Sequence, residues 1–154
     1  MKALCLWLVS IVVALALVAT PHTVTAAATA PVGVWLTESR DGAIAIAPCD
    51  SGLCGALVWF QPGDGAESAP PVDEHNPKPM LRHRPLCGLT MITGLTETEG
   101  GWTGWIYNPS DGSTYHTQLI MHADDTLEVH GYVGIPLLGK SQIWVRAPAD
   151  LGHC

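Results

Sequence analysis

Five histidines between residues 75 and 130 are the side chains best suited to proton transfer or metal binding in this chain: His75, His83, His116, His122 and His130. Imidazole titrates near neutral pH, which suits both kinds of chemistry. No His-x-His or Glu-x-x-His spacing occurs, however. We therefore interpret them as solvent-facing or hydrogen-bonded histidines, and we expect no metal site and no cofactor.

Nucleophilic side chains are few. Ser113 and Ser141 lack the Gly-x-Ser-x-Gly context that exposes a catalytic serine. Cys87 could act as a nucleophile if it were unpaired, because Arg82 and Arg84 nearby would favour its thiolate form. The sequence contains no other catalytic motif that we identify, so it favours a protein that is not an enzyme.

A polar cluster lies within a long segment, 61–84, that is rich in Pro, Gly, Asp and Glu. Asp73 and Glu74 could form an acid/base pair, but acidic residues in an exposed loop are more often only solvated. Asp73 and Asn76 better predict a capped turn, because Asn76 precedes Pro77 and cannot continue a helix. The segment is too long for a turn and is expected to be a functional or flexible loop.

Aromatic residues are the remaining side chains that could form a binding site. Trp102, Trp105 and Tyr107 fall on one expected strand, and Tyr115 falls on the next. Tryptophan and tyrosine offer apolar surface together with a polar group, so they either fill a core or line a mixed pocket. The functional hypothesis is a ligand cleft formed by these aromatics together with Arg82 and Arg84, under the Asp73 to Arg84 loop.

The elements that must position these residues are strands. Apolar and polar residues alternate with a period of two between Gly, Pro, Asn and Asp clusters, and helical periodicity is nearly absent. Eight strands are expected, over residues 32–38, 43–48, 53–60, 88–95, 101–108, 113–122, 127–133 and 138–146. Eight antiparallel strands are about the number that closes a small up-and-down barrel, which either fills with side chains or holds one ligand.

The first 26 residues are expected to be a signal peptide rather than part of this domain. Lys2 precedes an apolar run from Leu4 to Ala19, and Val24-Thr25-Ala26 suits cleavage after Ala26. An uncleaved membrane anchor is the alternative, although the run is short for a membrane span. The remaining domain, residues 27–154, would have no membrane span.

Cleavage also removes Lys2, which changes the net charge from -7 to -8. A chain with this charge is expected to bind neither nucleic acid nor anionic lipid.

Four cysteines remain after the expected cleavage: Cys49, Cys54, Cys87 and Cys154. In an exported protein an even number is most simply read as disulfides, and four cysteines allow three pairings. Cys49 and Cys54 flank the turn-forming Asp50-Ser51-Gly52 and could face each other across a hairpin, which would leave Cys87 with Cys154. Zinc ligands usually come as two close pairs, and only one is present here.

The ends of the expected sheet carry a further pattern. Gly33-x-Trp35 lies on the first strand and Trp144-x-Arg146 on the last, so closing the sheet could place the Arg146 guanidinium over the Trp35 indole. This pair resembles the lipocalin, or calycin, pattern. A longer series from Val32 to Arg146, including Asp73-x-x-Asn76-Pro77, Arg82-x-Arg84-Pro85-Leu86-Cys87-Gly88 and Trp102-x-Gly104, resembles the DUF2147 family.

The family resemblance implies a small exported barrel of Gram-negative bacteria, periplasmic or secreted, and implies no activity. Members of the family often carry a cysteine at the position of Tyr132, as the partner of the cysteine that matches Cys87. Cys154 is therefore either a substitute partner or a free thiol. The leading hypothesis is a non-enzymatic binder of a small apolar or amphipathic ligand. The alternative is a cell-envelope protein-interaction module with a filled core, whose long loop contacts another envelope protein.

Overall fold

The protein is described by a computed structural model that covers residues 29–61 and 70–154. The predicted signal peptide, residues 1–26, lies outside the described residues, as does the part of the long loop at 62–69. No helix in the described parts of the chain is long and apolar enough to cross a membrane.

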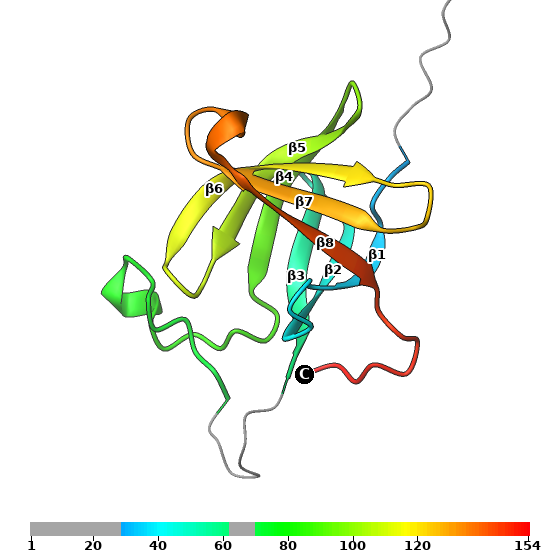
Figure 1. The fold of residues 1–154 in the computed structure, drawn as a ribbon. Helices are drawn as coiled ribbons and strands as arrows, with labels where there is room; N and C mark the ends of the chain where they lie inside the picture. The colour runs from blue at the N-terminus through cyan, green and yellow to red at the C-terminus, as the bar shows by residue number, and fades with distance from the viewer. Residues whose placement is uncertain (1–28, 62–69) are drawn as a thin grey trace, which may run out of the picture.

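The described chain forms one closed antiparallel barrel in which each strand pairs with its neighbours in sequence and the first strand pairs with the last (Figure 1). The strands are β1 Gly33–Leu36, β2 Gly42–Cys49, β3 Gly52–Phe60, β4 Thr90–Thr98, β5 Gly101–Asn108, β6 Ser113–Met121, β7 Leu127–Tyr132 and β8 Lys140–Arg146. This confirms the predicted all-β, eight-stranded, up-and-down barrel.

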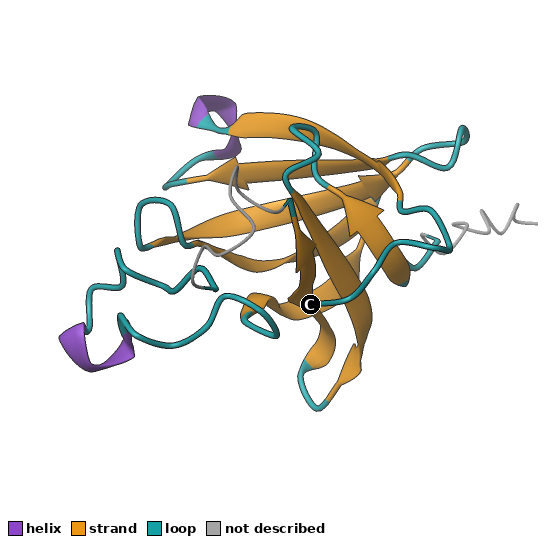
Figure 2. Cartoon of the chain, turned by 90° about the horizontal axis from the view of Figure 1, so that it is seen from below, coloured by secondary structure: helices purple, strands orange, loops and turns teal. Residues whose placement is uncertain are grey.

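Strand ends differ from the sequence prediction by a few residues. The strand β5 agrees at both ends, whereas β8 begins at Lys140 instead of Leu138 because Pro136–Leu138 form a short 3-10 helix, η2. A second 3-10 helix, η1, spans Pro79–Leu81 in the long loop. Each begins with proline, whose fixed φ suits the first helical position. Figure 2 shows both short helices on the same side of the barrel.

The barrel closes where β1 meets β8, with Trp35 opposite Arg146 in the register. The guanidinium carbon of Arg146 lies 3.8 Å from the centroid of the Trp35 ring, and its Nη1 donates a hydrogen bond to the carbonyl of Val32 at 2.8 Å. Gly33 has a φ of 130°, and a Cβ there would collide with the Arg146 guanidinium. Glycine is therefore required at this end for two independent reasons.

The core fills this closed end of the barrel. It is formed by the alternate residues of each strand that point inward. Its largest fully buried apolar side chains are Trp35, Ile44, Ile46, Ile92, Leu95, Leu119 and Leu127. The Trp35 indole donates a hydrogen bond to the carbonyl of Pro31 at 2.8 Å, so its polar group is satisfied although the side chain is fully buried.

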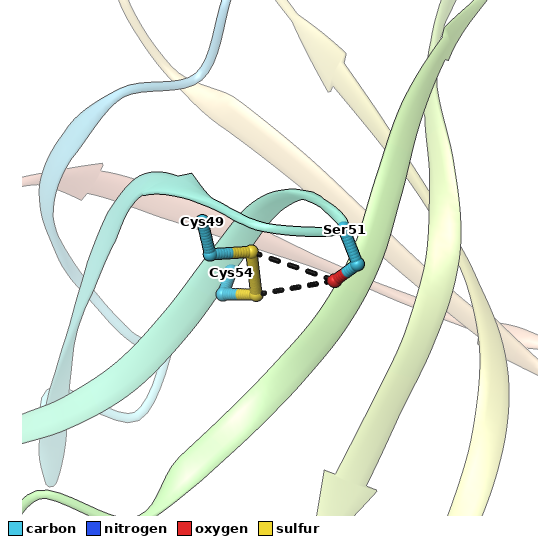
Figure 3. The surroundings of a disulfide bond; sticks show 3 residues. All are labelled: Cys49, Ser51 and Cys54. Carbon is cyan, nitrogen blue, oxygen red and sulfur yellow. Dashed lines mark hydrogen bonds between the residues drawn. A yellow bond between two sulfur atoms is a disulfide. The ribbon is translucent and has the colours of Figure 1, made fainter.

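Two disulfides are present. Cys49 and Cys54 are joined across the β2–β3 hairpin, with Cα atoms 5.8 Å apart, and the Ser51 hydroxyl lies beside both sulfurs (Figure 3). Cys87 and Cys154 are also joined, so the free-thiol alternative is wrong. The second bond ties the C-terminal tail to the segment before β4, and the Cys154 amide donates to the carbonyl of Val58 at 2.8 Å.

Candidate ligand-binding site

The barrel contains a cavity of about 840 Å³. It is lined in part by the β1–β2, β5–β6 and β7–β8 connections, which share one end of an up-and-down barrel. Trp35 and Arg146 close the other end. The volume lies within the range of about 300–1,000 Å³ that is usual for small-molecule sites. We call the end where these connections lie the open end.

The deep part of the cavity is apolar. Inward-facing Ile44 and Leu57 lie opposite each other on β2 and β3, and Val129 and Trp144 contribute from β7 and β8. Ile106 of β5 joins them. Such a floor accepts a hydrocarbon or ring system, since burying apolar surface is favourable at roughly 25 cal/mol per Å².

The rim is polar and carries two carboxylates. Asp41 lies in the β1–β2 turn; hydrogen bonding from Ser39 lowers its pKa, burial opposes this, and bonding from Thr37 adds to the lowering. Burial alone would raise the pKa of Asp111, but hydrogen bonds from Tyr115 at 2.7 Å, from the Ser113 amide and from Asn108 leave it lowered. Both carboxylates are therefore ionised at neutral pH.

The rim also carries one cation. Lys140 lies opposite Gly131 in the β7–β8 register and is, among the described residues, the single basic one that lines the cavity. It forms no ion pair within the described parts of the chain. An ammonium group of this kind, beside an apolar floor, can bind an anionic or hydrogen-bond-accepting group on a ligand.

Beside the open end, the long loop is held to the barrel by a buried carboxylate. The Asp73 side chain is fully buried, and it accepts hydrogen bonds from Tyr107 at 2.6 Å and Asn76 at 2.7 Å. Arg84 forms an ion pair with it at 2.7 Å. Burial raises the pKa of Asp73, but these hydrogen bonds and the Arg84 charge outweigh burial and leave the pKa below its ordinary value.

The four aromatic residues proposed from sequence for the ligand site fall in three places. Tyr107 and Tyr115 lie on the cavity wall. Trp105 is 45% exposed and packs on His116 with ring centroids 3.8 Å apart, outside the cavity. The Trp102 indole donates to the carbonyl of Thr29 at 3.3 Å, so it lies at the N-terminal, closed end.

The two arginines of that hypothesis do not line the cavity. Arg84 is committed to Asp73, and the Arg82 Nε donates to the carbonyl of Asn76 at 2.8 Å. With Cys87 in a disulfide, the idea of a Cys87 nucleophile activated by these arginines is wrong. Both arginines instead hold the long loop in place.

Three histidines of the β6–β7 hairpin lie in separate hydrogen-bonded or stacked positions. His116 is between Trp105 and Tyr132, His122 lies 3.2 Å from Glu128, and the His130 Nδ1 lies 2.8 Å from the Ser141 hydroxyl. Within residues 29–61 and 70–154, no three His, Cys, Asp or Glu side chains come together as a metal site would require.

Sequence reasoning missed the charged rim residues Asp41, Asp111 and Lys140. The local pattern identifies Asp41 and Asp111 only as turn residues. The signal that could have found them is topological: in an up-and-down barrel, every second connection lies at the same end, so charged residues of alternate turns gather around one opening.

The fold and its sequence also agree with known proteins. A family model described as "Uncharacterized protein conserved in bacteria (DUF2147)" matches residues 33–146. The chain belongs to this family. Among solved structures it is similar to HP1028 from Helicobacter pylori, described as belonging to the lipocalin family, with a TM-score of 0.66 and 21% identity. The likeness covers 79% of this chain and 85% of that chain, and it shows a lipocalin-like fold. No curated protein matches the chain.

Membership in a bacterial family bears on location as well as fold. This DUF2147 protein carries two disulfides, and disulfides persist in oxidising compartments. A bacterial protein stabilised in this way belongs outside the cytoplasm.

Proposed function

We propose that this DUF2147 protein is a non-enzymatic binder of one small amphipathic molecule, exported by a Gram-negative bacterium to the periplasm or beyond. The apolar part of the ligand occupies the floor formed by Ile44, Leu57 and Val129. Its polar part stays at the rim, near Lys140 and Tyr115. Lipocalin-like barrels suit this role because closure gives them an interior that side chains need not fill.

The observation that supports the proposal best is the cavity itself. It combines a volume of about 840 Å³ with an apolar floor and a charged rim. A barrel packed only for stability is expected to fill this space, because an empty cavity lowers stability in proportion to its size. The alternative of an interaction module with a filled core is favoured less, since the interior is filled only at the closed end.

The proposal predicts that narrowing the cavity weakens ligand binding. Gly131 lines the cavity, and the nearest atom to a Cβ there is Ile106 Cγ2 at 4.0 Å, so a larger side chain can enter the open space. We expect Gly131→Phe to weaken binding of a pyrene-labelled fatty acid by at least tenfold, measured by fluorescence titration. Gly152→Phe is the matched control, because a Cβ added at Gly152 would have no atom within 4 Å.

Two results would contradict the proposal. One is the absence of saturable binding together with no co-purifying small molecule in native mass spectrometry of protein from the cell envelope. The other is equal weakening by both substitutions, which would show that binding does not depend on the cavity.

A further inference from the structure

The connection between β7 and β8 exposes four apolar side chains next to the cavity. Val133, Ile135, Leu137 and Leu138 are 66%, 55%, 88% and 75% exposed. Val133 and Leu138 also line the cavity, so the apolar surface continues from the cavity onto the outside of the molecule. Clusters of this kind on a protein surface usually mark a contact with another surface.

This apolar tip, residues 133–138, is held in a defined shape. The amides of Leu138 and Gly139 donate to the carbonyls of Ile135 and Pro136, which form the turn of η2. The His130 Nε2 also lies 2.8 Å from the Pro136 carbonyl, and a Cβ on Gly139 would collide with the His130 ring. These contacts therefore fix the conformation in which the apolar side chains of the tip are exposed.

A second apolar tip lies on the long loop. Met80 of η1 is 93% exposed. The loop reaches the same end of the barrel, because the carbonyl of His75 packs against Gly112 in the β5–β6 turn, which borders the cavity. Both views of the molecule show η1 and η2 projecting from that end (Figures 1 and 2).

Both tips are accompanied by basic side chains. Segments 75–86 and 129–149 contain no acidic residue, although the whole chain has a net charge of -7. Lys78 and Lys140 form no ion pair within the described parts of the chain, and Arg82 bonds only a backbone carbonyl there. Apolar side chains flanked by cations match the interface of a bilayer, where acyl chains lie beneath phosphate groups.

We infer that the open end of the barrel docks on a lipid bilayer, with Leu137, Leu138 and Met80 entering the interface and Lys78, Lys140 and Arg82 near the phosphates. Separate protruding tips suit a deformable lipid surface, whereas a protein partner usually needs one contiguous, well-packed patch. The negative charge of the whole chain, and the ionised Asp41 and Asp111 on the rim of this same end, oppose attraction to anionic lipid, so the apolar contacts carry most of the affinity. This inference goes beyond the proposed ligand binding.

Vesicle co-sedimentation of the mature chain tests the inference. With vesicles of phosphatidylethanolamine and phosphatidylglycerol, we expect the bound fraction to fall at least fivefold for L137S/L138S and to a smaller extent for M80S. The matched control is Ile143→Ser, because Ile143 is 40% exposed on β8, outside the tips. The K78Q/K140Q variant is expected to bind these vesicles more weakly, with a smaller loss than L137S/L138S, and to bind vesicles of phosphatidylcholine alone as the unaltered chain does.

The inference is overturned if the unaltered chain does not sediment with either vesicle, or if the tip variants sediment as well as it does. An effect of Ile143→Ser equal to that of L137S/L138S would also overturn it. If the tips instead contact an envelope protein, the chain does not sediment with vesicles. A crosslinker at position 137 then captures that protein, and replacing Leu138 and Met80 by serine reduces the capture. The Gly131→Phe variant is expected to bind vesicles normally, so failure of ligand binding and failure of docking are distinguishable.

Discussion

Asp73 is a fully buried carboxylate whose two oxygens both receive hydrogen bonds, Oδ1 from Tyr107 and Oδ2 from Asn76 and Arg84. Its pKa in the folded protein is lowered, because these bonds outweigh the opposing effect of burial. A lowered folded pKa means that the ionised carboxylate stabilises the fold. That stabilisation is fully present above the unfolded pKa, about 3.9, and is lost as the pH falls through the folded pKa.

At this residue scale, we expect Asp73→Asn to lower the free energy of unfolding near neutral pH by roughly 1–3 kcal/mol, since it weakens several charge-assisted hydrogen bonds at once. The difference from the unaltered protein should shrink below about pH 4, where the unaltered carboxylate also becomes protonated. Urea denaturation of both proteins near neutral pH and below about pH 4 measures this difference in the free energy of unfolding. Asp150→Asn, at an exposed position, serves as control, and a difference independent of pH would contradict the explanation.

At the scale of elements, the two disulfides close loops of very different length. Cys49 and Cys54 are separated by 5 residues within one hairpin, whereas Cys87 and Cys154 are separated by 67 and join the tail to the segment before β4. In the chain-entropy model, a longer closed loop restricts the unfolded chain more. The second bond also holds the tail beside β3, where strand pairing does not reach it.

We therefore expect C87S/C154S to lower the free energy of unfolding by roughly 4 kcal/mol, against roughly 2 kcal/mol for C49S/C54S. Guanidinium denaturation of both variants under oxidising conditions compares them directly. Equal losses, or a larger loss for the hairpin pair, would show that the loop-length argument does not apply to this barrel.

At the scale of the whole molecule, the barrel is a packed core at one end and an open cavity at the other. The closed end is packed with Trp35, Arg146 and buried aliphatic side chains. At the open end, the space between the apolar floor and Lys140 is not filled by a side chain. A ligand that binds only the folded cavity must stabilise the whole fold, because the barrel cannot open without releasing it.

Saturation with the pyrene-labelled fatty acid at about 100 times its dissociation constant should therefore raise the free energy of unfolding by about 2.7 kcal/mol. At the same concentration Gly131→Phe should gain about 1.4 kcal/mol or less, because its affinity is at least tenfold weaker, while Gly152→Phe should behave like the unaltered protein. Denaturation with and without the fatty acid measures the effect, and a full gain of about 2.7 kcal/mol in Gly131→Phe would place the bound molecule outside the cavity.

The sequence by itself determined the strands, their number, their order and the closure of the barrel. It could do so because alternation along a strand, turn residues such as Pro109-Ser110-Asp111-Gly112, and the Cys49–Cys54 hairpin are local in the chain. The η2 turn escaped prediction, because Leu138 continues the apolar pattern of β8 although Pro136 starts a 3-10 turn.

Only the tertiary structure decided which residues face the cavity. Trp105 and Ile106 are neighbours on one strand, yet Trp105 packs outside the barrel and Ile106 lines its interior. Alternation says that the two point to opposite faces but not which face is inside, and the register shift between Thr93 and Thr96 is not visible in the pattern. Likewise Asp41, Asp111 and Lys140 lie around one opening, because the closed barrel brings segments that are distant in the sequence to the same end. No local sequence pattern shows that these segments lie near one another.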